Sequence, residues 1–509
     1  MENKKTKIVS IIAIIALVLT VVTATYAYFQ VQTGEGSQAD VKINANTVDT
    51  LTFETGSAIS LSLDQTSFAQ GTGNKTGTTF AKAMLTANNK TNSATEHYYL
   101  YLNISNNSFI YTQDENTPEI LLTIKDSSNN EITSISGLTY KTLTDASGAS
   151  IKGFDITTKT GLITLLNNRE ITTTSTKTDT WNVTITFINY NADQSANAGK
   201  SFSAKLMIQK NQIITNIANV CETGNNLKSC LNTLGSDGTL EFTNLYYHDS
   251  SLANGAGDNS YRYAGPSKKV NNFVCFGSTE SPCPTDNLYR IIGVIDGKVK
   301  LIKYDYATST LLGTDGAHYG ASSPNKDYYK GSLTSIDTYY WNNATPTNKW
   351  SESNLNKINL NTNFINNIGS TWVNKIATTT WKVGGNIENK IVYPVPSVAY
   401  QNEIVSPAEN TTYDAKIGLI YVSDYGFASS PSEWTISLYG YGVDNNWMYM
   451  GYNEWTVSRR TDGYNRIYIA GQVYSSSDIG RGIRPSFSLE SSITYVSGSG
   501  SKSDPVRIN

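Results

Sequence analysis

Hydrophobic and polar residues alternate with a period of two over much of the segment from residue 31 to residue 210. Such alternation is typical of strands that bury one face and expose the other. Polar clusters at 126–130 and 145–150 separate the alternating runs at hairpin distances. The alternating core positions are Leu100, Leu102, Ile104, Ile120, Leu122, Ile124, Trp181, Val183, Ile185, Phe187, Phe202, Ala204, Leu206 and Ile208. The pattern predicts that residues 30–210 form an antiparallel β-sandwich of the jelly-roll type.

The following segment, residues 211–239, changes to helical spacing. Apolar residues recur three or four positions apart in two short stripes, formed by Ile213, Ile214, Ile217 and Val220 and by Leu227, Leu231 and Leu234. We therefore predict a helical connector over this segment, with its helix ending at Gly235.

Residues 240–509 combine strand and helix signals. Leu288–Ile295 and Lys298–Lys303 are predicted strands, and the Asp-Gly pair between them is a strong hairpin signal. The apolar positions of Ser353–Ile368 fall on one helical face, and Ser351 or Ser353 is a suitable cap. A Ser-Pro-Ser-Glu capping box starting at Ser430 predicts a helix through Trp434 to Leu438. Short helices among antiparallel strands predict an α+β domain.

The first 29 residues have the form of an export signal. Lys4, Lys5 and Lys7 precede an apolar run over residues 8–22, and small residues at 24, 25 and 27 offer a cleavage site. We favour a cleaved signal peptide. The alternative is a membrane anchor, because residues 8–29 are long enough to span a bilayer as a helix. The positive-inside rule then keeps the lysines in the cytoplasm, so both interpretations place residues 31–509 outside the cell.

The four cysteines fall into two close pairs. Cys221 and Cys230 are nine positions apart, and Cys275 and Cys283 are eight apart. Four cysteines allow three connectivities, and we predict the two local disulfides, as suits an exported protein. The alternative is reduced thiols in small loops. Neither pair has Cys-x-x-Cys spacing, so no metal site is predicted.

Composition narrows the function classes. Charged residues make up 16% of the chain and the net charge is −3, so no basic excess for nucleic acid exists. His97, His248 and His318 do not form a catalytic pattern with their sequence neighbours, and no nucleotide-binding or hydrolase motif is present. We expect a protein that is not an enzyme. Paired carboxylates of a glycosidase, drawn from Glu433, Asp444, Glu454 and Asp462, remain an alternative.

Residues 439–482 are crowded with Tyr, Ser, Gly, Asn and Arg, the residues that binding loops favour. Tyrosine and tryptophan give rigid contacts, and arginine donates bidentate hydrogen bonds to carboxylate or sulfate groups. The candidate ligand-binding residues are Trp447, Tyr449, Tyr452, Arg459, Tyr464 and Arg466. The alternative is a tyrosine-rich exposed sheet without a ligand. No cofactor is predicted. Calcium is a minor alternative, since the oxygen-rich segments 249–258 and 444–446 do not match an EF-hand.

The TYAYF sequence at the end of the apolar run resembles the signals of the TasA and camelysin family of Gram-positive bacteria. The resemblance covers about six residues, the apolar run and a similar strand-rich character. It implies secretion, a β-sandwich and a link to biofilm fibres or cell-surface attachment.

The C-terminal half resembles a module that recurs on surface proteins of low-GC Gram-positive bacteria. The resemblance rests on phrases such as NLYRIIGVIDGKVKLIK, AKIGLIYVSDYGFA, EWTVSR and GIRPSFSL, which span most of residues 240–509. The module has no activity that can be carried over. Its end, EWTVSRR followed by RGIRPSFSL, is similar to the close of C-type-lectin-like domains of the formylglycine-enzyme type. The active-site cysteines of those enzymes have no counterpart in these strands.

Together these features predict an exported bacterial cell-surface protein that adheres to or recognises a glycan or a surface protein through residues 240–509. The membrane is a second partner if the N-terminal helix is retained. A structural subunit that self-assembles into fibres or biofilm matrix, as the TasA resemblance implies, is the alternative. A carbohydrate-active enzyme is the third.

Overall fold

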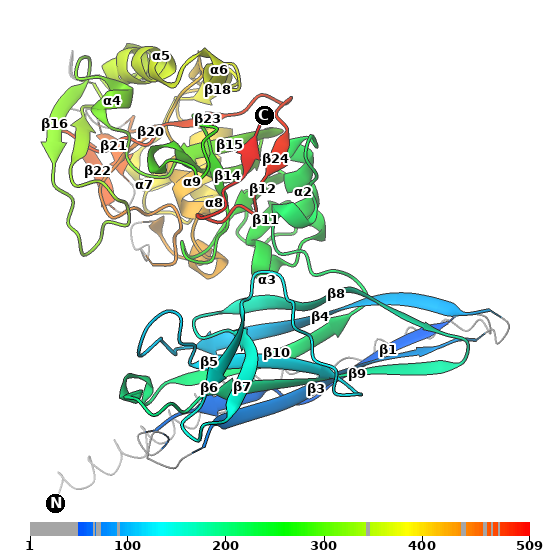
Figure 1. Ribbon diagram of the computed structural model, residues 1–509. Helices are drawn as coiled ribbons and strands as arrows, with labels where there is room; N and C mark the ends of the chain where they lie inside the picture. Colours follow the sequence, from blue (N-terminus) through cyan, green and yellow to red (C-terminus); the bar gives the residue numbers. More distant parts are fainter. Residues whose placement is uncertain are drawn as a thin grey trace, which may run out of the picture. The chain divides into compact units, whose positions relative to one another are not determined.

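The computed structural model describes residues 49–509, except residues 65–66, 68–72, 89–91, 343–346, 439–443, 462–465, 470–471 and 477–478. The chain divides into two compact units, Met1–Gln212 and Ile213–Asn509 (Figure 1). The predicted signal peptide or anchor over residues 1–29 lies outside the described residues. None of the helices in the described part of the chain combines the length and the apolar character needed to cross a bilayer.

The first unit consists of two antiparallel sheets (Figure 1). The larger sheet has the order β1-β3-β9-β5-β7-β6, with β1 (Thr50–Thr55), β3 (Lys75–Thr86), β5 (Ile120–Asp126), β6 (Tyr140–Thr144), β7 (Ser150–Asp155) and β9 (Thr176–Phe187). The smaller sheet has the order β2-β10-β4-β8, with β2 (Ile59–Ser62), β4 (Ala94–Asn107), β8 (Gly161–Thr173) and β10 (Ser201–Gln209). A short 3₁₀ helix, η2 (Ser195–Asn197), precedes β10.

Both sheets contribute to one hydrophobic core, which is where the predicted alternation places its apolar side chains. Trp181 of β9 illustrates how polar groups are accommodated in this core. Its indole nitrogen donates to the Tyr98 hydroxyl at 2.8 Å, and that hydroxyl donates to Asp179 at 2.9 Å. The prediction of an antiparallel, strand-rich first domain is therefore confirmed.

The second unit is built on a sheet with the order β11-β12-β14-β15-β23. Its strands are β11 (Leu245–His248), β12 (Ser260–Tyr263), β14 (Leu288–Ile295), β15 (Lys298–Lys303) and β23 (Ser486–Ser488), and β13 (Phe273–Cys275) also pairs with β14. The predicted hairpin is confirmed at both strand boundaries. Its turn residues Asp296 and Gly297 have φ angles of 50° and 70°, as an Asp-Gly hairpin turn requires.

Short elements surround this sheet. The remaining strands are β16 (His318–Ser322), β17 (Ile336–Tyr339), β18 (Thr379–Lys382), β19 (Thr412–Ala415), β20 (Trp455–Arg459), β21 (Arg466–Ile469), β22 (Gln472–Ser476), β24 (Tyr495–Ser497) and β25 (Arg507–Ile508). The α-helices are α2 (Leu227–Asp237), α3 (Leu240–Thr243), α4 (Ser309–Leu312), α5 (Ile365–Ile368), α6 (Ser370–Val373), α7 (Glu388–Ile391), α8 (Pro396–Tyr400) and α9 (Val422–Phe427). Other helical turns are η3 (Ile217–Asn219), η4 (Thr285–Asn287), η5 (Trp350–Glu352), η6 (Leu355–Phe364), η7 (Gln401–Val405) and η8 (Pro431–Thr435).

The helices predicted over Ser353–Ile368 and from Ser430 to Leu438 differ from the prediction in helix type or length. The segment Ser353–Ile368 is helical, but most of it, η6, is a π-helix that continues into α5. The Ser353 hydroxyl accepts from the Asn356 backbone, as predicted for a cap. The Ser430 segment yields only the 3₁₀ turn η8, without a side-chain cap. Its extension to Leu438 is wrong, because the Leu438 backbone nitrogen donates instead to the Pro394 carbonyl at 3.1 Å.

The segment predicted as a connector folds as part of the second unit. Leu227, Leu231 and Leu234 of α2 are buried in the core of that unit. The helix continues beyond Gly235 to Asp237. Gly235 is needed for close packing instead, since a Cβ atom there would lie 2.3 Å from the Tyr261 ring.

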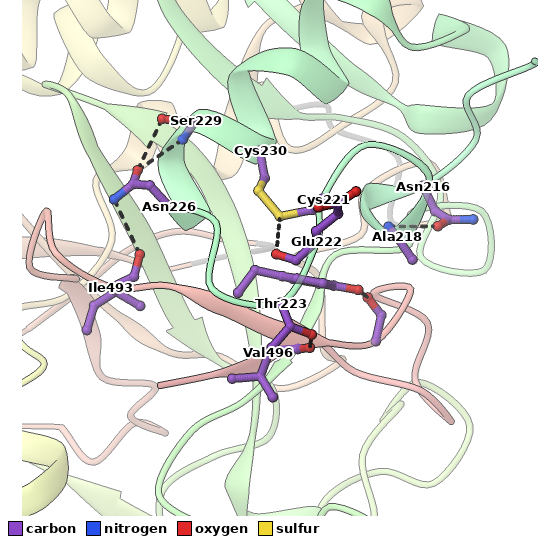
Figure 2. Close-up of a disulfide and its surroundings, with 12 residues drawn as sticks. Asn216, Ala218, Cys221, Glu222, Thr223, Asn226, Ser229, Cys230, Ile493 and Val496 are labelled. Carbon is purple, nitrogen blue, oxygen red and sulfur yellow. Dashed lines mark hydrogen bonds between the residues drawn. A yellow bond between two sulfur atoms is a disulfide. The ribbon is translucent and has the colours of Figure 1, made fainter.

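The start of the second unit is also bonded to its end (Figure 2). The Thr223 hydroxyl donates to the Val496 carbonyl at 2.7 Å, and the Asn226 side chain donates to the Ile493 carbonyl at 3.5 Å. Thr223 and Asn226 both lie in the loop that the disulfide Cys221–Cys230 closes. Cys275 pairs with Cys283, so both predicted local disulfides are confirmed and neither thiol pair is left reduced.

We predict that replacing Cys221 and Cys230 by alanine lowers the free energy of unfolding of the second unit by about 2–3 kcal/mol, because the unfolded chain gains loop entropy. Guanidinium denaturation of the purified chain, followed by tryptophan fluorescence, measures the change. Seven of the eight tryptophans lie beyond residue 240 and report on this unit. Peptide mapping without reductant should recover the two local pairs, and four free thiols would contradict the structure.

Candidate functional site

The predicted ligand-binding residues divide into buried and accessible groups. Trp447 is fully buried, and its indole nitrogen donates to the Tyr263 carbonyl at 2.8 Å. Arg459 is 9% exposed. Tyr449 and Tyr452 are partly exposed. Tyr464 lies outside the described residues, and Arg466 is placed on β21 without a description of its side chain.

Tyr449 lies beside a loop that is more than a hundred residues away in sequence, residues 325–331. Tyr328 of this loop is 58% exposed, the highest value among the large hydrophobic residues in the described part of the molecule. The Lys330 ammonium lies 5.1 Å from the centre of the Tyr449 ring and 3.9 Å from an oxygen of Asp444. We call Tyr328, Lys330, Asp444 and Tyr449 the tyrosine face.

Local hydrogen bonds give the 325–331 loop its shape. The Asn325 side chain accepts from the Asp327 backbone at 3.0 Å, and the Asn325 carbonyl accepts from the Tyr329 backbone at 2.9 Å. The Tyr329 hydroxyl donates to the buried Asp305, whose other oxygen accepts from the Ser332 backbone at 2.8 Å. Tyr329 therefore anchors the loop, and its neighbour Tyr328 is presented to solvent.

The two loops of the tyrosine face approach each other at backbone level. The Lys330 backbone amide donates a hydrogen bond to the Met450 carbonyl at 3.0 Å. Gly451 has a φ of +88°, and a Cβ atom there would lie 2.0 Å from the Tyr328 carbonyl oxygen. Only glycine combines this conformation with this approach. The position of Tyr328 is thus set by the segment that carries Tyr449.

The segment 446–454 has almost no regular structure, and buried side chains hold it through its carbonyl groups. Arg484 forms a two-point ion pair with Glu454, both almost fully buried, and donates to the Met448 carbonyl at 2.6 Å. Arg290 donates to the Trp447 carbonyl at 3.1 Å, and the Tyr306 hydroxyl donates to the Tyr452 carbonyl at 2.6 Å. The loop is therefore held in one conformation before any ligand binds.

Burial and neighbouring charges shift the pKa values of the side chains that hold this segment and of those on the tyrosine face. Burial by itself lowers the pKa of the Arg484 guanidinium, but the Glu454 carboxylate raises it above its ordinary value. Arg290 has no carboxylate partner among the described residues, and burial lowers its pKa to about 9. At the surface, burial raises the pKa of Tyr449, with Tyr328 and Asp444 adding to the effect. Burial lowers the pKa of Lys330, and Asp444 opposes this change.

Arg459, which was expected to bind an anionic ligand, is engaged in contacts within the protein, and so is its neighbour Arg460. Arg459 forms an ion pair with Glu409 and donates to the Val383 carbonyl at 3.0 Å. Arg460 pairs with Glu388 at 2.6 Å. Arg459 therefore holds neighbouring segments together and does not present its guanidinium to solvent.

Another cluster of buried ionisable groups connects two strands of the main sheet, β12 and β15, with helix α9. Asp424 accepts from Arg262 at 3.1 Å and from Lys300 at 2.5 Å, and all three residues are buried. Burial opposes the charge on Asp424, but Lys300 and Arg262 hold its pKa below the ordinary value. Because these side chains are closed off from solvent and satisfied by each other, the cluster has a structural role.

Each of the three histidines has its own local surroundings. His97 is on β4 and 3.8 Å from Glu170, while His318 is on β16 and 3.5 Å from Asp337. His248 is fully buried between Phe427 and Trp434. No cluster of three His, Cys, Asp or Glu residues with the arrangement of a metal site occurs in the described ranges. Asp249, at the start of the segment considered for calcium, bonds its own turn through Ser251 and Leu252.

Comparison with known proteins does not assign the chain to a family. The chain matches no protein-family model, no curated protein and no solved structure. The resemblances noted in the sequence therefore carry weight only as proposals.

Sequence reasoning missed half of the tyrosine face. Tyr328 and Lys330 stand in NKDYYKG, where two tyrosines occur in a polar, glycine-bounded loop. That composition matches the binding-loop signal used for residues 439–482. Nothing in the sequence indicates that the two loops lie side by side.

We predict that Arg484→Met destabilises the second unit by about 3–5 kcal/mol, because Glu454 is left as an unpaired buried charge. Removing both charges in Glu454→Met/Arg484→Met should recover most of this loss. Urea denaturation of both variants measures the difference. Equal destabilisation of the single and double variants would contradict the assignment of the ion pair as the source of the loss.

The pKa values of two buried groups, His248 and Glu403, are shifted in opposite directions from their ordinary values. Burial and the neighbouring Arg262 lower the pKa of His248 from 6.5 to about 3. Its Nδ1 accepts from the Ala256 backbone at 3.0 Å, and its Nε2 has no hydrogen-bond partner among the described residues. Burial raises the pKa of Glu403 from 4.5 to about 7, although the Ser423 and Val422 backbones donate to it.

Between pH 6.5 and pH 4.5, the unfolded chain binds the His248 proton and the folded chain binds the Glu403 proton. Acidification therefore removes about 2–3 kcal/mol of stability through His248 and adds a similar amount through Glu403. We predict that His248→Gln gains stability on acidification over this range, that Glu403→Gln loses it, and that the native chain changes little. Chemical denaturation at several pH values measures the slopes.

The matched control for this experiment is His97→Gln, since His97 is an exposed histidine of the first unit. It should leave the pH dependence of the second unit unchanged. Asp258 and Asp424, whose pKa values are lowered, titrate below this window. Identical slopes in both variants would show that neither buried group controls the dependence.

Proposed function

We propose that this chain is an exported bacterial cell-surface protein whose second unit recognises a glycan or a surface protein through the tyrosine face. The observation that carries the proposal is the presentation of Tyr328 and Tyr449 on two loops that are fixed by buried residues. Exposed tyrosine gives a large contact area at low entropic cost, and a loop held before binding loses little further freedom. Adhesion to a partner surface is the corresponding biological role.

The location outside the cell is supported by the two disulfides, because such bonds persist in oxidising compartments. The Lys-rich start and apolar run of the sequence support export, with either cleavage or retention as an anchor. In this proposal the first unit is a jelly-roll-like sandwich of the TasA type, and the second is C-type-lectin-like. The TasA resemblance keeps a fibre-forming role as the alternative.

The test is a binding screen of the purified chain against immobilised glycans and bacterial and host surface proteins. We predict that Tyr328→Ala/Tyr449→Ala weakens binding to any ligand found by about thirtyfold, the effect of removing one strong contact of about 2 kcal/mol. Tyr247→Ala is the matched control, because Tyr247 is a 40% exposed tyrosine on the edge strand β11. Unchanged binding by the double variant would remove the tyrosine face from the proposal.

A further inference from the structure

The buried pair of Lys300 and Asp424 brings an amine and a carboxyl group into direct contact. The Lys300 Nζ lies 2.5 Å from the Asp424 Oδ2, and the two side chains are 7% and 3% exposed. Other lysine–carboxylate pairs of the described residues have exposed lysines, as in Lys125–Glu131, where the lysine side chain is 43% exposed. Lys300 and Asp424 therefore meet where water does not compete for either group.

Neighbouring groups hold the Asp424 carboxyl group in a fixed orientation. Its Oδ1 accepts from Arg262 at 3.1 Å, and its Oδ2 also accepts from the Tyr421 backbone at 3.0 Å. The Lys300 Nζ lies 4.7 Å from the centre of the Tyr421 ring and 5.5 Å from that of Trp381. A nitrogen in hydrogen-bond contact with a carboxyl oxygen is also about 3–3.5 Å from the carboxyl carbon, the separation that precedes bond formation.

Both charges of this pair can disappear without leaving a buried charge alone. Arg262 also forms an ion pair with Asp258 at 2.7 Å, so it keeps a partner when Asp424 becomes neutral. Burial and, to a smaller extent, the Asp424 charge raise the pKa of Glu403 to about 7, so loss of that charge removes a repulsion. A neutral amide would also lack the desolvation cost of the two buried ions.

We propose that Lys300 and Asp424 condense into an intramolecular amide bond after the second unit has folded. The ammonium first passes a proton to Oδ2 along their hydrogen bond. The Nζ then bonds to Cγ and the Cγ–Oδ2 bond breaks. The Oδ2 leaves as water with two of the ammonium protons, and the third stays on the amide nitrogen. Arg262 donates to Oδ1, where negative charge develops during the attack. No oxidant or further reactant is required.

The reaction occurs once in each molecule and does not need to be fast. Burial opposes the charge on Asp424, but Lys300 and Arg262 keep its pKa below the ordinary value, so the neutral, reactive pair is the minor form. Fixed contact and exclusion of water favour the step. The bond joins β15 to α9 across a separation of 124 residues. The segment between them then cannot be extended when the unit is pulled.

Mass spectrometry of the full chain, reduced and denatured, tests this proposal once the N-terminal residue has been determined. The chain should be lighter than its sequence by one water molecule. Trypsin should release peptide 299–303 linked to peptide 417–459, because it does not cleave after an acylated lysine. The full sequence mass, or a water loss located in any other peptide, would overturn the proposal.

Lys300→Arg keeps a positive charge beside Asp424 but cannot form the amide, because the guanidinium stays protonated. This variant should have its full sequence mass. It should also migrate more slowly than the native chain on a reducing, denaturing gel, since the cross-link keeps the denatured native chain more compact.

Lys298→Arg is the matched control, because Lys298 is on the same strand and its Nζ lies 3.5 Å from the Thr378 carbonyl oxygen. It should retain both the water loss and the linked peptides. Water loss in Lys300→Arg would contradict the assignment of the bond. The linked peptides of the native chain decide the question even if a variant does not fold, and no ligand binding enters the test, so its failure leaves the proposed function in place.

Discussion

The buried ion pair between Arg484 and Glu454 is the interaction on which the second unit most depends. It joins the end of the irregular segment 446–454 to the segment that leads into β23, the last strand in the order of the main sheet. Two charges removed from water are stable only when they meet each other with good geometry, so the pair permits a single arrangement of the chain. Arg484 also binds the Met448 carbonyl, which extends this constraint into the loop that carries Tyr449.

Other buried arginines of the second unit also form hydrogen bonds with segments that are distant in sequence. Arg290, Arg262 and Arg459 are each buried, and each bonds carbonyl or carboxylate groups of distant segments. Strand pairing is short in this part of the chain, and long connections need other partners for their backbone groups. Buried guanidinium groups supply them, because one planar side chain offers five donors. The first unit has long paired strands and uses this device far less.

Buried side chains also explain why the loops of the tyrosine face have a fixed conformation. The tyrosine face stands on two loops that have no ladder of backbone hydrogen bonds of their own. Tyr329 with Asp305 fixes one loop, and Arg484 with Glu454 fixes the other. Gly451 lets the two backbones approach closely enough to set Tyr328 beside Tyr449. Because folding has already ordered these loops, a ligand would bind them with little further loss of conformational entropy.

Local signals in the sequence were sufficient to determine the alternating strands of the first unit, the 288–303 hairpin and the two disulfides. Each depends on residues that are near in sequence: a period of two, an Asp-Gly turn, or cysteines eight or nine positions apart. The Ser430 capping box failed to give a helix to Leu438, because a bond to Pro394 redirects the chain. Gly235 was interpreted as a helix end when it serves packing against Tyr261. Only the tertiary structure decided which aromatic and charged residues reach the surface, since burial of Trp447 and Arg459 and the meeting of Tyr328 with Tyr449 depend on contacts between distant segments.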